Sequence, residues 1–311
     1  MDKFDLEYIN LRTVSDPEEF CRECDADYMK KVNKAVDRIV GNIAESPIVL
    51  LSGPSGSGKT TTAKKISEEL ERRGIGTHYV SMDDYFKTVS PETTPRTPEG
   101  DYDLESPLCL DMDLLNRHFT ELSKGKKIYV PYYQFSTRTR GSNPSKSIQL
   151  KKDEVVVFEG IHALNDMITD SHPEAFKLHI SAQSDVTFKG EKIFKCTWFR
   201  LVRRMVRDYN FRGSSSEETM GMWDNVRRGE KLYISPFKNK ADFSFDTCHP
   251  CELAVMNQTA TDLFREIPEG ISRYDELRQV FPALQYFGEI AEDCVPKDSL
   301  LREFIGGGIY G

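Results

Sequence analysis

The chain has 311 residues, of which 38% are hydrophobic and 30% charged, a composition typical of a soluble globular protein. Its formal net charge of −8 argues against a general binder of nucleic acid or of membrane surfaces, so we expect no partner of either kind. No apolar run approaches the roughly 18 residues of a membrane-spanning helix. The first residues contain no apolar signal segment, and the seven cysteines are an odd number. We therefore expect reduced thiols and a cytoplasmic location.

Residues 1–45 are expected to form helices packed ahead of the core. The run Asp16-Pro17-Glu18-Glu19 has the composition of a helix start, because Asp is a favoured N-cap and Pro a favoured first residue. From residue 28 to residue 43, apolar side chains recur at helical spacing.

Two cysteine pairs have the spacing of metal ligands, Cys21 with Cys24 and Cys248 with Cys251. A four-cysteine zinc site usually brings its two pairs within about 15–20 residues of each other. Here they lie more than two hundred residues apart. We therefore expect partly buried thiols rather than zinc ligands.

The next segment matches a phosphate-binding loop both in sequence and in context. Residues 53–60 read Gly-Pro-Ser-Gly-Ser-Gly-Lys-Thr, the pattern G-x-x-x-x-G-K-[ST]. An apolar run precedes them and a helical stretch follows, which is the strand–loop–helix order that this site requires. Backbone N–H groups would wrap a phosphate, Lys59 would reach the β- and γ-phosphates, and the Thr60 hydroxyl would be placed for Mg²⁺. The nucleotide-binding residues expected here are Gly53, Ser55, Gly56, Ser57, Gly58, Lys59, Thr60 and Thr61.

From residue 46 onward, short apolar strands alternate with helices, which predicts an α/β fold with a doubly wound parallel sheet. The expected strands span residues 48–52, 78–81, 154–158, 177–181 and 242–245, and the first expected helix spans residues 59–73. Residues 127–131 and 147–151 should form a small antiparallel hairpin. The proline-rich stretch 88–100 is expected to be a mobile loop.

Helical patterns return after residue 252. The expected helices are 252–265, 273–280 (ended by Pro282) and 299–304. We therefore divide the chain into an N-terminal helical segment (1–45), a P-loop domain (46–251) and a helical extension (252–311). The extension could pack on the kinase domain or form the contact of a homo-oligomer.

Acidic residues follow two of the expected strands, at the sheet edge where ligands bind in open α/β folds. Asp83 and Asp84 follow the second strand, and Glu159 follows the third. Phosphoryl transfer to an alcohol needs a group that takes the hydroxyl proton and a group that helps to hold Mg²⁺. Asp83 suits the first task and Glu159 the second. Asp84 is an alternative base, and helix capping is the alternative role for these acids.

An arginine-rich helix is predicted further along the chain. Arg200, Arg203, Arg204 and Arg207 recur at i, i+3, i+4 and i+7, which places them on one helix face. Like charges on one face repel, so an anion should offset them. Together with Arg212 and a Gly/Ser-rich hinge, the pattern favours a lid that brings arginines onto ATP. A solvated face paired with surface acids is the alternative, and RNA binding is disfavoured because the rest of the chain is acidic.

These motifs together resemble the uridine kinase and phosphoribulokinase family of P-loop kinases, over about residues 46–250. The most specific parts are residues 53–61, 81–86, 155–160 and 200–213. The resemblance implies a P-loop NTPase fold with a helical lid, ATP and Mg²⁺ as cofactors, and a small-molecule alcohol as acceptor. It implies that Asp83 is the catalytic base and Glu159 the magnesium-side carboxylate. It also implies that the lid arginines contact nucleoside and phosphates: Arg200, Arg203 and Arg212.

The acceptor side carries weaker motifs of the same family. Residues 105–111 resemble a stretch whose first acid binds the ribose hydroxyls, which implies that role for Glu105. Residues 131–140 resemble a segment in which Tyr133 and Phe135 would flank the base. Arg138 stands where uridine kinases carry a histidine that reads the pyrimidine, so this chain departs from the family at the acceptor pocket. Residues 227–230 and 299–307 resemble a bacterial branch of uridine or nucleoside kinases.

The sequence thus predicts an ATP- and Mg²⁺-dependent kinase of pyrimidine salvage, which phosphorylates the 5′-hydroxyl of uridine and, as a second acceptor, cytidine. Lys59, Mg²⁺ and the lid arginines would stabilise charge on the transferred group. One alternative is a kinase of the same fold for another alcohol, such as a sugar phosphate or pantothenate, which Arg138 favours. Another is a nucleotide-gated regulatory module with little turnover.

Overall fold

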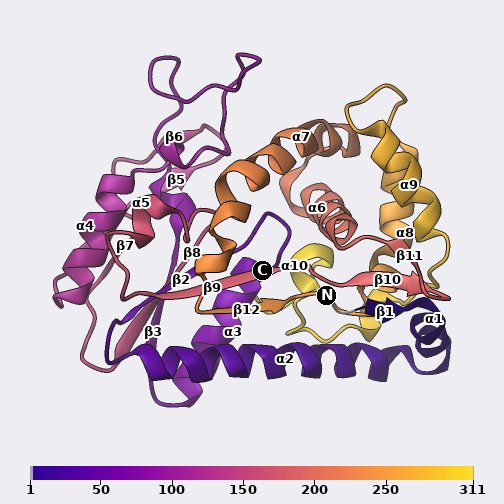
Figure 1. Ribbon diagram of the computed structural model, residues 1–311, viewed down its shortest axis with the longest axis horizontal. Helices are drawn as coiled ribbons and strands as arrows, with labels where there is room; N and C mark the ends of the chain where they lie inside the picture. Colours follow the sequence, from indigo (N-terminus) through magenta and orange to yellow (C-terminus); the bar gives the residue numbers. More distant parts are fainter. Residues whose placement is uncertain (1–2, 311) are drawn as a thin grey trace.

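Five short strands form one parallel sheet at the centre of the molecule (Figure 1). The structure is a computed structural model, and it describes residues 3–310. The strands are β2 (Ile48–Ser52), β3 (Gly76–Ser81), β8 (Glu154–Glu159), β9 (Phe176–Ser181) and β12 (Phe243–Asp246). They are ordered β12–β9–β2–β8–β3, with every neighbouring pair parallel. All five expected strands are present, which confirms the predicted α/β fold.

Helices cover both faces of this sheet because alternate strand residues point to opposite sides. Val49 and Leu51 share a buried cluster with α2 (Pro17–Asn42) and α3 (Lys59–Arg72). Ile48 and Leu50 pack instead in the cluster that contains α4 (Met112–Ser123). The start of α2 agrees with the sequence: the Asp16 side chain accepts a hydrogen bond from the Glu19 N–H (3.2 Å), and Pro17 is the first helical residue.

The predicted hairpin stands beside α4. Its strands β4 (Ile128–Val130) and β7 (Lys146–Ile148) pair antiparallel, and a smaller pair, β5 (Tyr133–Gln134) with β6 (Thr139–Arg140), lies between them in the chain. Residues 88–100 contain turns but no helix, as their prolines predict. Figure 1 shows the β5–β6 region raised above the edge of the main sheet.

A second sheet has three strands and was not expected from the sequence. It is ordered β1 (Lys3–Asp5), β10 (Asp185–Phe188) and β11 (Glu191–Phe194), with β1 parallel to β10 and β11 antiparallel to it. Each strand has only three or four residues, too few to show a two-residue hydrophobic period. The partner of β1 also lies far along the chain, so no local pattern identifies the pair.

The remaining helices form a second layered region on the β10–β11 side (Figure 1). They are α1 (Leu6–Ser15), α6 (Cys196–Arg212), α7 (Ser216–Gly229), α8 (Glu252–Arg265), α9 (Tyr274–Leu284) and α10 (Arg302–Ile305), while the short α5 (Asp166–Thr169) follows β8. The expectation that Pro282 ends α9 is wrong, because Pro282 lies inside its last turn. A proline there removes only one backbone donor close to the helix end, where the chain can continue for two residues.

The four cysteines with metal-ligand spacing, Cys21, Cys24, Cys248 and Cys251, are free thiols buried in one hydrophobic cluster. The N-terminal segment, α6, α7 and the C-terminal segment all contribute to this cluster. Within residues 3–310, no group of three or more His, Cys, Asp or Glu side chains is arranged to hold a metal ion. In the same range, no helix has both the length and the apolar character needed to cross a membrane.

Candidate active site

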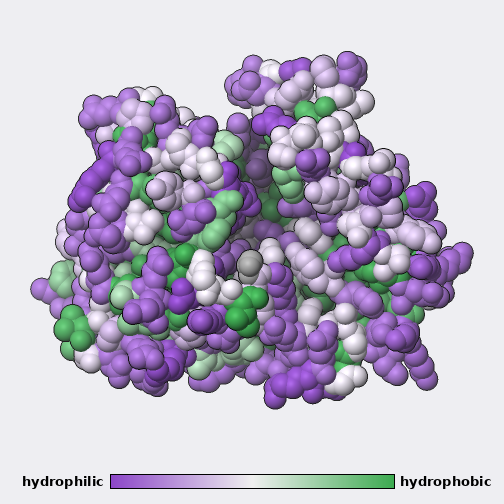
Figure 2. Space-filling model, turned by 180° about the vertical axis from the view of Figure 1, so that it is seen from behind, coloured by the Kyte–Doolittle hydropathy of each residue, from purple (hydrophilic) through white to green (hydrophobic). Residues whose placement is uncertain are grey.

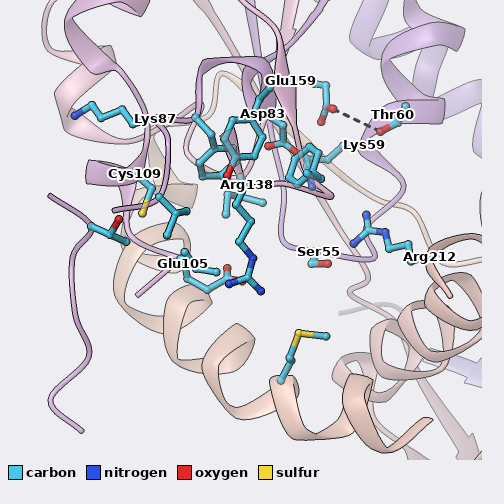
Figure 3. A pocket seen from close by; sticks show the side chains of 18 of the residues that line it. Ser55, Lys59, Thr60, Asp83, Lys87, Glu105, Cys109, Arg138, Glu159 and Arg212 are labelled. Carbon is cyan, nitrogen blue, oxygen red and sulfur yellow. Dashed lines mark hydrogen bonds between the residues drawn. The ribbon is translucent and has the colours of Figure 1, made fainter. Parts of the chain in front are cut away.

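One cavity of about 360 Å³ joins the phosphate-binding loop, the ends of β3 and β8, the hairpin region and α6. The surface of the molecule is hollowed between the hairpin region and the region of α6 and α7 that faces it across the cavity (Figure 2). Figure 3 shows Lys59, Asp83 and Glu159 close together in this cavity, with Glu105 farther along it. The expected site residues that line it are Ser55, Gly56, Gly58, Lys59, Thr60, Asp83, Glu105, Tyr133, Phe135, Arg138, Glu159, Arg204, Arg207 and Arg212. Those that do not are Gly53, Ser57, Thr61, Arg200 and Arg203.

The loop between β2 and α3 has a backbone that only glycine allows at two points. Gly56 and Gly58 have φ values of 75° and 81°, in the left-handed region. A Cβ added to Gly53 would lie 2.3 Å from the carbonyl oxygen of Ile180, so this glycine lets the loop approach β9. These conformations shape the loop that leads into the N-terminus of α3, where backbone N–H groups bind a phosphate in this motif.

Two carboxylates meet the loop at the sheet edge. The Glu159 Oε1 accepts hydrogen bonds from the Tyr79 hydroxyl (3.0 Å) and the Ser81 hydroxyl (3.3 Å), and it lies 3.5 Å from the Thr60 hydroxyl. Burial raises the pKa of Glu159 from 4.5 to about 7, although the nearby Lys59 acts in the opposite direction. Burial also raises the pKa of Asp83, again against Lys59.

These groups fit a divalent cation. Mg²⁺ binds hard oxygen ligands and needs only one or two from the protein when a phosphate supplies others. The Thr60 hydroxyl and the Glu159 carboxylate lie side by side (Figure 3) and offer such a pair. Ionisation of both buried acids would be favoured by a cation between them.

The structure separates the two candidate bases. The short 3₁₀ helix Met82–Tyr85 follows β3, and the Ser81 hydroxyl accepts a hydrogen bond from the Asp83 N–H (3.3 Å). This turn directs Asp83 into the cavity. Asp84 does not line the cavity; burial raises its pKa, and Lys146 opposes the rise.

Three arginines of the α6 region line the cavity and share one carboxylate that the sequence analysis overlooked. Asp208 is 1% exposed and lies 3.3 Å from Arg204, 2.6 Å from Arg207 and 3.4 Å from Arg212 (N–O distances). Arg204 also donates a hydrogen bond to the Ser55 hydroxyl (2.8 Å). Three guanidinium groups against one carboxylate leave an excess of positive charge at the cavity, which an anionic ligand would offset.

Arg200 and Arg203 do not line this cavity, contrary to expectation. Arg203 is fully buried, pairs with Glu252 (2.5 Å) and donates to the Gly56 carbonyl (3.3 Å). Arg200 donates to the Ser55 carbonyl (2.9 Å) and pairs with Glu230 (2.8 Å). The reason is general: a loop that turns its N–H groups toward a ligand turns carbonyls the other way, and buried carbonyls need donors. These two arginines support the loop from behind.

Aromatic rings and one acid form the far end of the cavity. The Tyr133 ring lies 5.4 Å from that of Phe86 and 5.0 Å from that of Phe135 (centroid distances). Phe86 was missed in the sequence, although it follows the candidate base by only three residues. Burial raises the pKa of Glu105 to about 7. A Cβ added to Gly229 would lie 2.4 Å from the Glu105 Cβ, so α7 packs directly on this acid.

Comparison with known proteins points to one family. The profile described as "Phosphoribulokinase / Uridine kinase family" matches residues 48–253. A uridine kinase of Staphylococcus epidermidis is 30% identical over 200 residues, which are 64% of this chain and 86% of that protein. A uridine kinase of Staphylococcus haemolyticus is 29% identical over 201 residues, 64% and 87% of the two chains. A solved structure titled "Structure of a Possible Uridine Kinase from Bacillus stearothermophilus" covers 69% of this chain and 98% of its own, with a TM-score of 0.42 and 18% identity.

Proposed function

The chain belongs to the phosphoribulokinase and uridine kinase family, and on this basis we propose that it phosphorylates the 5′-hydroxyl of uridine, with cytidine as a second acceptor. It is a phosphotransferase, and ATP-dependent phosphoryl transfer follows from its family. One observation carries the proposal: a single cavity joins the phosphate-binding loop to a buried carboxylate and then to an aromatic wall. Its volume of about 360 Å³ falls within the range of small-molecule sites.

Nucleotide phosphates would bind at the loop end of the cavity. Lys59 and the backbone N–H groups at the start of α3 would hold them, and Arg204, Arg207 and Arg212 would add positive charge from α6. The Thr60 hydroxyl and Glu159 carboxylate would hold Mg²⁺, which when bound would neutralise charge on the phosphate oxygens.

The acceptor would occupy the other end. The rings of Phe86, Tyr133 and Phe135 suit the flat face of a base, and Glu105 suits the ribose hydroxyls. A nucleoside held in this way would direct its 5′-hydroxyl toward Asp83. The Asp83 carboxylate would then take the hydroxyl proton as the oxygen attacks the γ-phosphorus in line.

A second candidate is a kinase for an alcohol that already carries an anionic group. Arg138 lines the acceptor end of the cavity. A guanidinium there would meet a phosphate or carboxylate on the acceptor. The choice between the two depends on the acceptor alone, because both use the same loop and the same base.

Steady-state ADP formation with Mg·ATP tests the proposal against a panel of acceptors: uridine, cytidine, adenosine, ribulose 5-phosphate and pantothenate. We expect stimulation by uridine and cytidine. A response restricted to ribulose 5-phosphate or pantothenate would contradict the nucleoside assignment and favour the second candidate. No stimulation by any of them, with ATP still bound, would favour the regulatory module.

A further inference from the structure

The C-terminal segment places a carboxylate in the nucleotide end of the cavity. Glu303 belongs to α10, outside the residues 48–253 that match the family, yet it lines the cavity. Its Oε2 accepts a hydrogen bond from the backbone N–H of Thr61 (3.1 Å). Thr61 lies in the first turn of α3, directly after the loop, where backbone N–H groups hold nucleotide phosphates in this class of site. Glu303 thus occupies a donor that a phosphate oxygen would use.

Residues that precede and follow Glu303 in the chain pack against the phosphate-binding loop and against Arg203, which supports that loop. Leu300 is fully buried against Gly58, where an added Cβ would lie 2.5 Å from its Cδ1. Phe304 is fully buried under the guanidinium of Arg203, 5.1 Å from its ring centroid. The backbone around Glu303 therefore stays in place unless this packing is lost, so that only its side chain can swing out of the nucleotide site.

Further contacts hold the segment to α3. Lys65 pairs with Asp298 (3.3 Å) and lies over the ring of Tyr310 (5.3 Å), whose hydroxyl donates to Glu68 (2.6 Å). These contacts extend along the outer length of α3, away from the cavity. The segment is thus anchored independently of whatever occupies the nucleotide site.

The charge of Glu303 acts on the same groups that a phosphate would contact. Burial lowers the pKa of Lys59, while Glu159, Asp83 and Glu303 act in the opposite direction. Without nucleotide, Glu303 offsets part of the positive charge of Lys59 and the cavity arginines. When a phosphate arrives, two anions compete for one N–H and for the same cations.

We propose that Glu303 competes with the nucleotide at the donor site: it holds the Thr61 N–H until a phosphate displaces it, and so it lowers the affinity for the nucleotide. The inference rests on the proposed function only in that the loop binds a nucleotide. It does not depend on which alcohol accepts the phosphoryl group.

Direct titration of the full-length chain with Mg·ATP, without any acceptor, tests this inference. We compare wild type with Glu303→Gln, which removes only the charge, and Glu303→Ala, which removes the group. Asp298→Asn is the matched control, since it removes a carboxylate from the same segment outside the cavity. We expect both Glu303 variants to bind Mg·ATP about tenfold more tightly, because a like charge close to the phosphates is gone, and Asp298→Asn to bind as wild type does.

Kinetics give a second readout once an acceptor is known. The KM for ATP should fall in both Glu303 variants while kcat is retained, since Glu303 is displaced before the transfer step. A thermal unfolding transition in each variant shows that it is folded.

Unchanged or weaker binding of Mg·ATP in both Glu303 variants would overturn the inference. Unchanged binding would mean that the carboxylate does not affect the nucleotide affinity, and weaker binding would mean that it favours nucleotide binding. Failure of wild type and variants alike to bind Mg·ATP would overturn it together with the nucleotide assignment. Tighter binding in the variants, with no acceptor that stimulates turnover, would support it while contradicting the proposed function.

Discussion

At the scale of single residues, burial sets the properties of the acids beside the phosphate-binding loop. Glu159 is 5% exposed, and its pKa rises to about 7 because burial outweighs the attraction of Lys59. Burial raises the pKa of Asp83 as well. A raised pKa brings a carboxylate closer to the proton affinity that a general base needs near neutral pH. The same burial makes both acids costly to ionise until a cation arrives.

Replacing Asp83 by Asn tests the assignment of the base. We expect kcat to fall about 10²–10⁴-fold, because an amide cannot take the hydroxyl proton. Binding of Mg·ATP, measured by titration, should change little, since the phosphates contact the loop. Asp84→Asn is the matched control and should retain turnover, because Asp84 lies outside the cavity. Full activity of Asp83→Asn would remove Asp83 from this role.

The raised pKa of Glu159 predicts a pH dependence of folding stability. Its pKa is about 7 in the folded chain and has the ordinary value of 4.5 when unfolded. Between these values the folded chain binds more protons than the unfolded chain, so ionisation of Glu159 costs stability as pH rises. Glu159→Gln lacks this cost. The unfolding free energy of the variant minus that of wild type should therefore be larger at pH 8 than at pH 5, by an amount on the order of 1–3 kcal/mol.

Urea unfolding without divalent cations measures this difference at both pH values. Titrating groups that do not interact with Glu159, such as His118 and His172, are common to the two proteins and cancel in the comparison. Asp83 and Lys59 interact with Glu159, so the difference measures the ionisation of Glu159 together with its effect on these two neighbours. A difference that stays constant between pH 5 and pH 8 would show that Glu159 ionises normally in the folded chain.

At the scale of elements, the arginines of α6 divide between two roles: some hold the phosphate-binding loop in place and others line the cavity. Arg200 and Arg203 hold the carbonyls of the loop, whereas Arg204, Arg207 and Arg212 line the cavity. The helical spacing correctly placed the first four on one helix. It could not separate the two roles, because the deciding partners, Glu230 and Glu252, come from elsewhere in the chain.

Two glycines of α7 offer a matched pair of substitutions. Gly229→Ala would bring a Cβ to 2.4 Å from the Glu105 Cβ, so Glu105 or α7 must shift. We expect a several-fold higher KM for the acceptor with little change in KM for ATP. Gly221→Ala meets nothing within 4 Å and should leave both KM values unchanged. Because alanine is the better helix former, Gly221→Ala should also stabilise the protein by up to about 1 kcal/mol.

Initial rates at varied acceptor and ATP concentrations separate the two KM values. If both Gly229→Ala and Glu105→Gln leave the acceptor KM at the wild-type value, Glu105 does not contact the acceptor, and the role that the family resemblance gives it is wrong.

Local patterns predicted the central sheet and the loop because each element carries its own signal. Strands β2 and β8 are apolar runs, apolar residues alternate with others in β9 and β12, and the loop has a fixed spacing of glycines and Lys59. The pairing of β1 with β10 and the contact between Glu303 and Thr61 join residues far apart in the chain. Such contacts are set by packing of whole elements, and a single sequence carries no period that reveals them.

At the scale of the whole molecule, the segments before and after the family match share one core with α6 and α7. Phe20 of α2, Trp223 of α7 and Phe264 of α8 belong to the same buried cluster. Glu252, at the start of α8, is the partner of the fully buried Arg203. We propose that the segments 1–45, 46–251 and 252–311 unfold as one cooperative unit.

A fragment of residues 46–251 tests this proposal. It loses the carboxylate that neutralises Arg203, and an unpaired buried charge costs about 3–5 kcal/mol. It also exposes apolar side chains of α6 and α7 that α8 and α10 cover. Because a domain's total stability is typically about 5–15 kcal/mol, we expect no cooperative transition in urea, followed by tryptophan fluorescence. A fragment that unfolds cooperatively and binds Mg·ATP would show an independent kinase domain.

The most direct measurement for the central claim is the product formed from uridine and Mg·ATP, with 5′-deoxyuridine as the matched blank. The two nucleosides share base and ribose contacts, but only uridine carries the hydroxyl that Asp83 would activate. We predict one 5′-UMP for each ADP with uridine, and no acceptor-dependent ADP with 5′-deoxyuridine. ADP formation that is equal with both nucleosides, or uridine phosphorylated at another hydroxyl, would contradict the account.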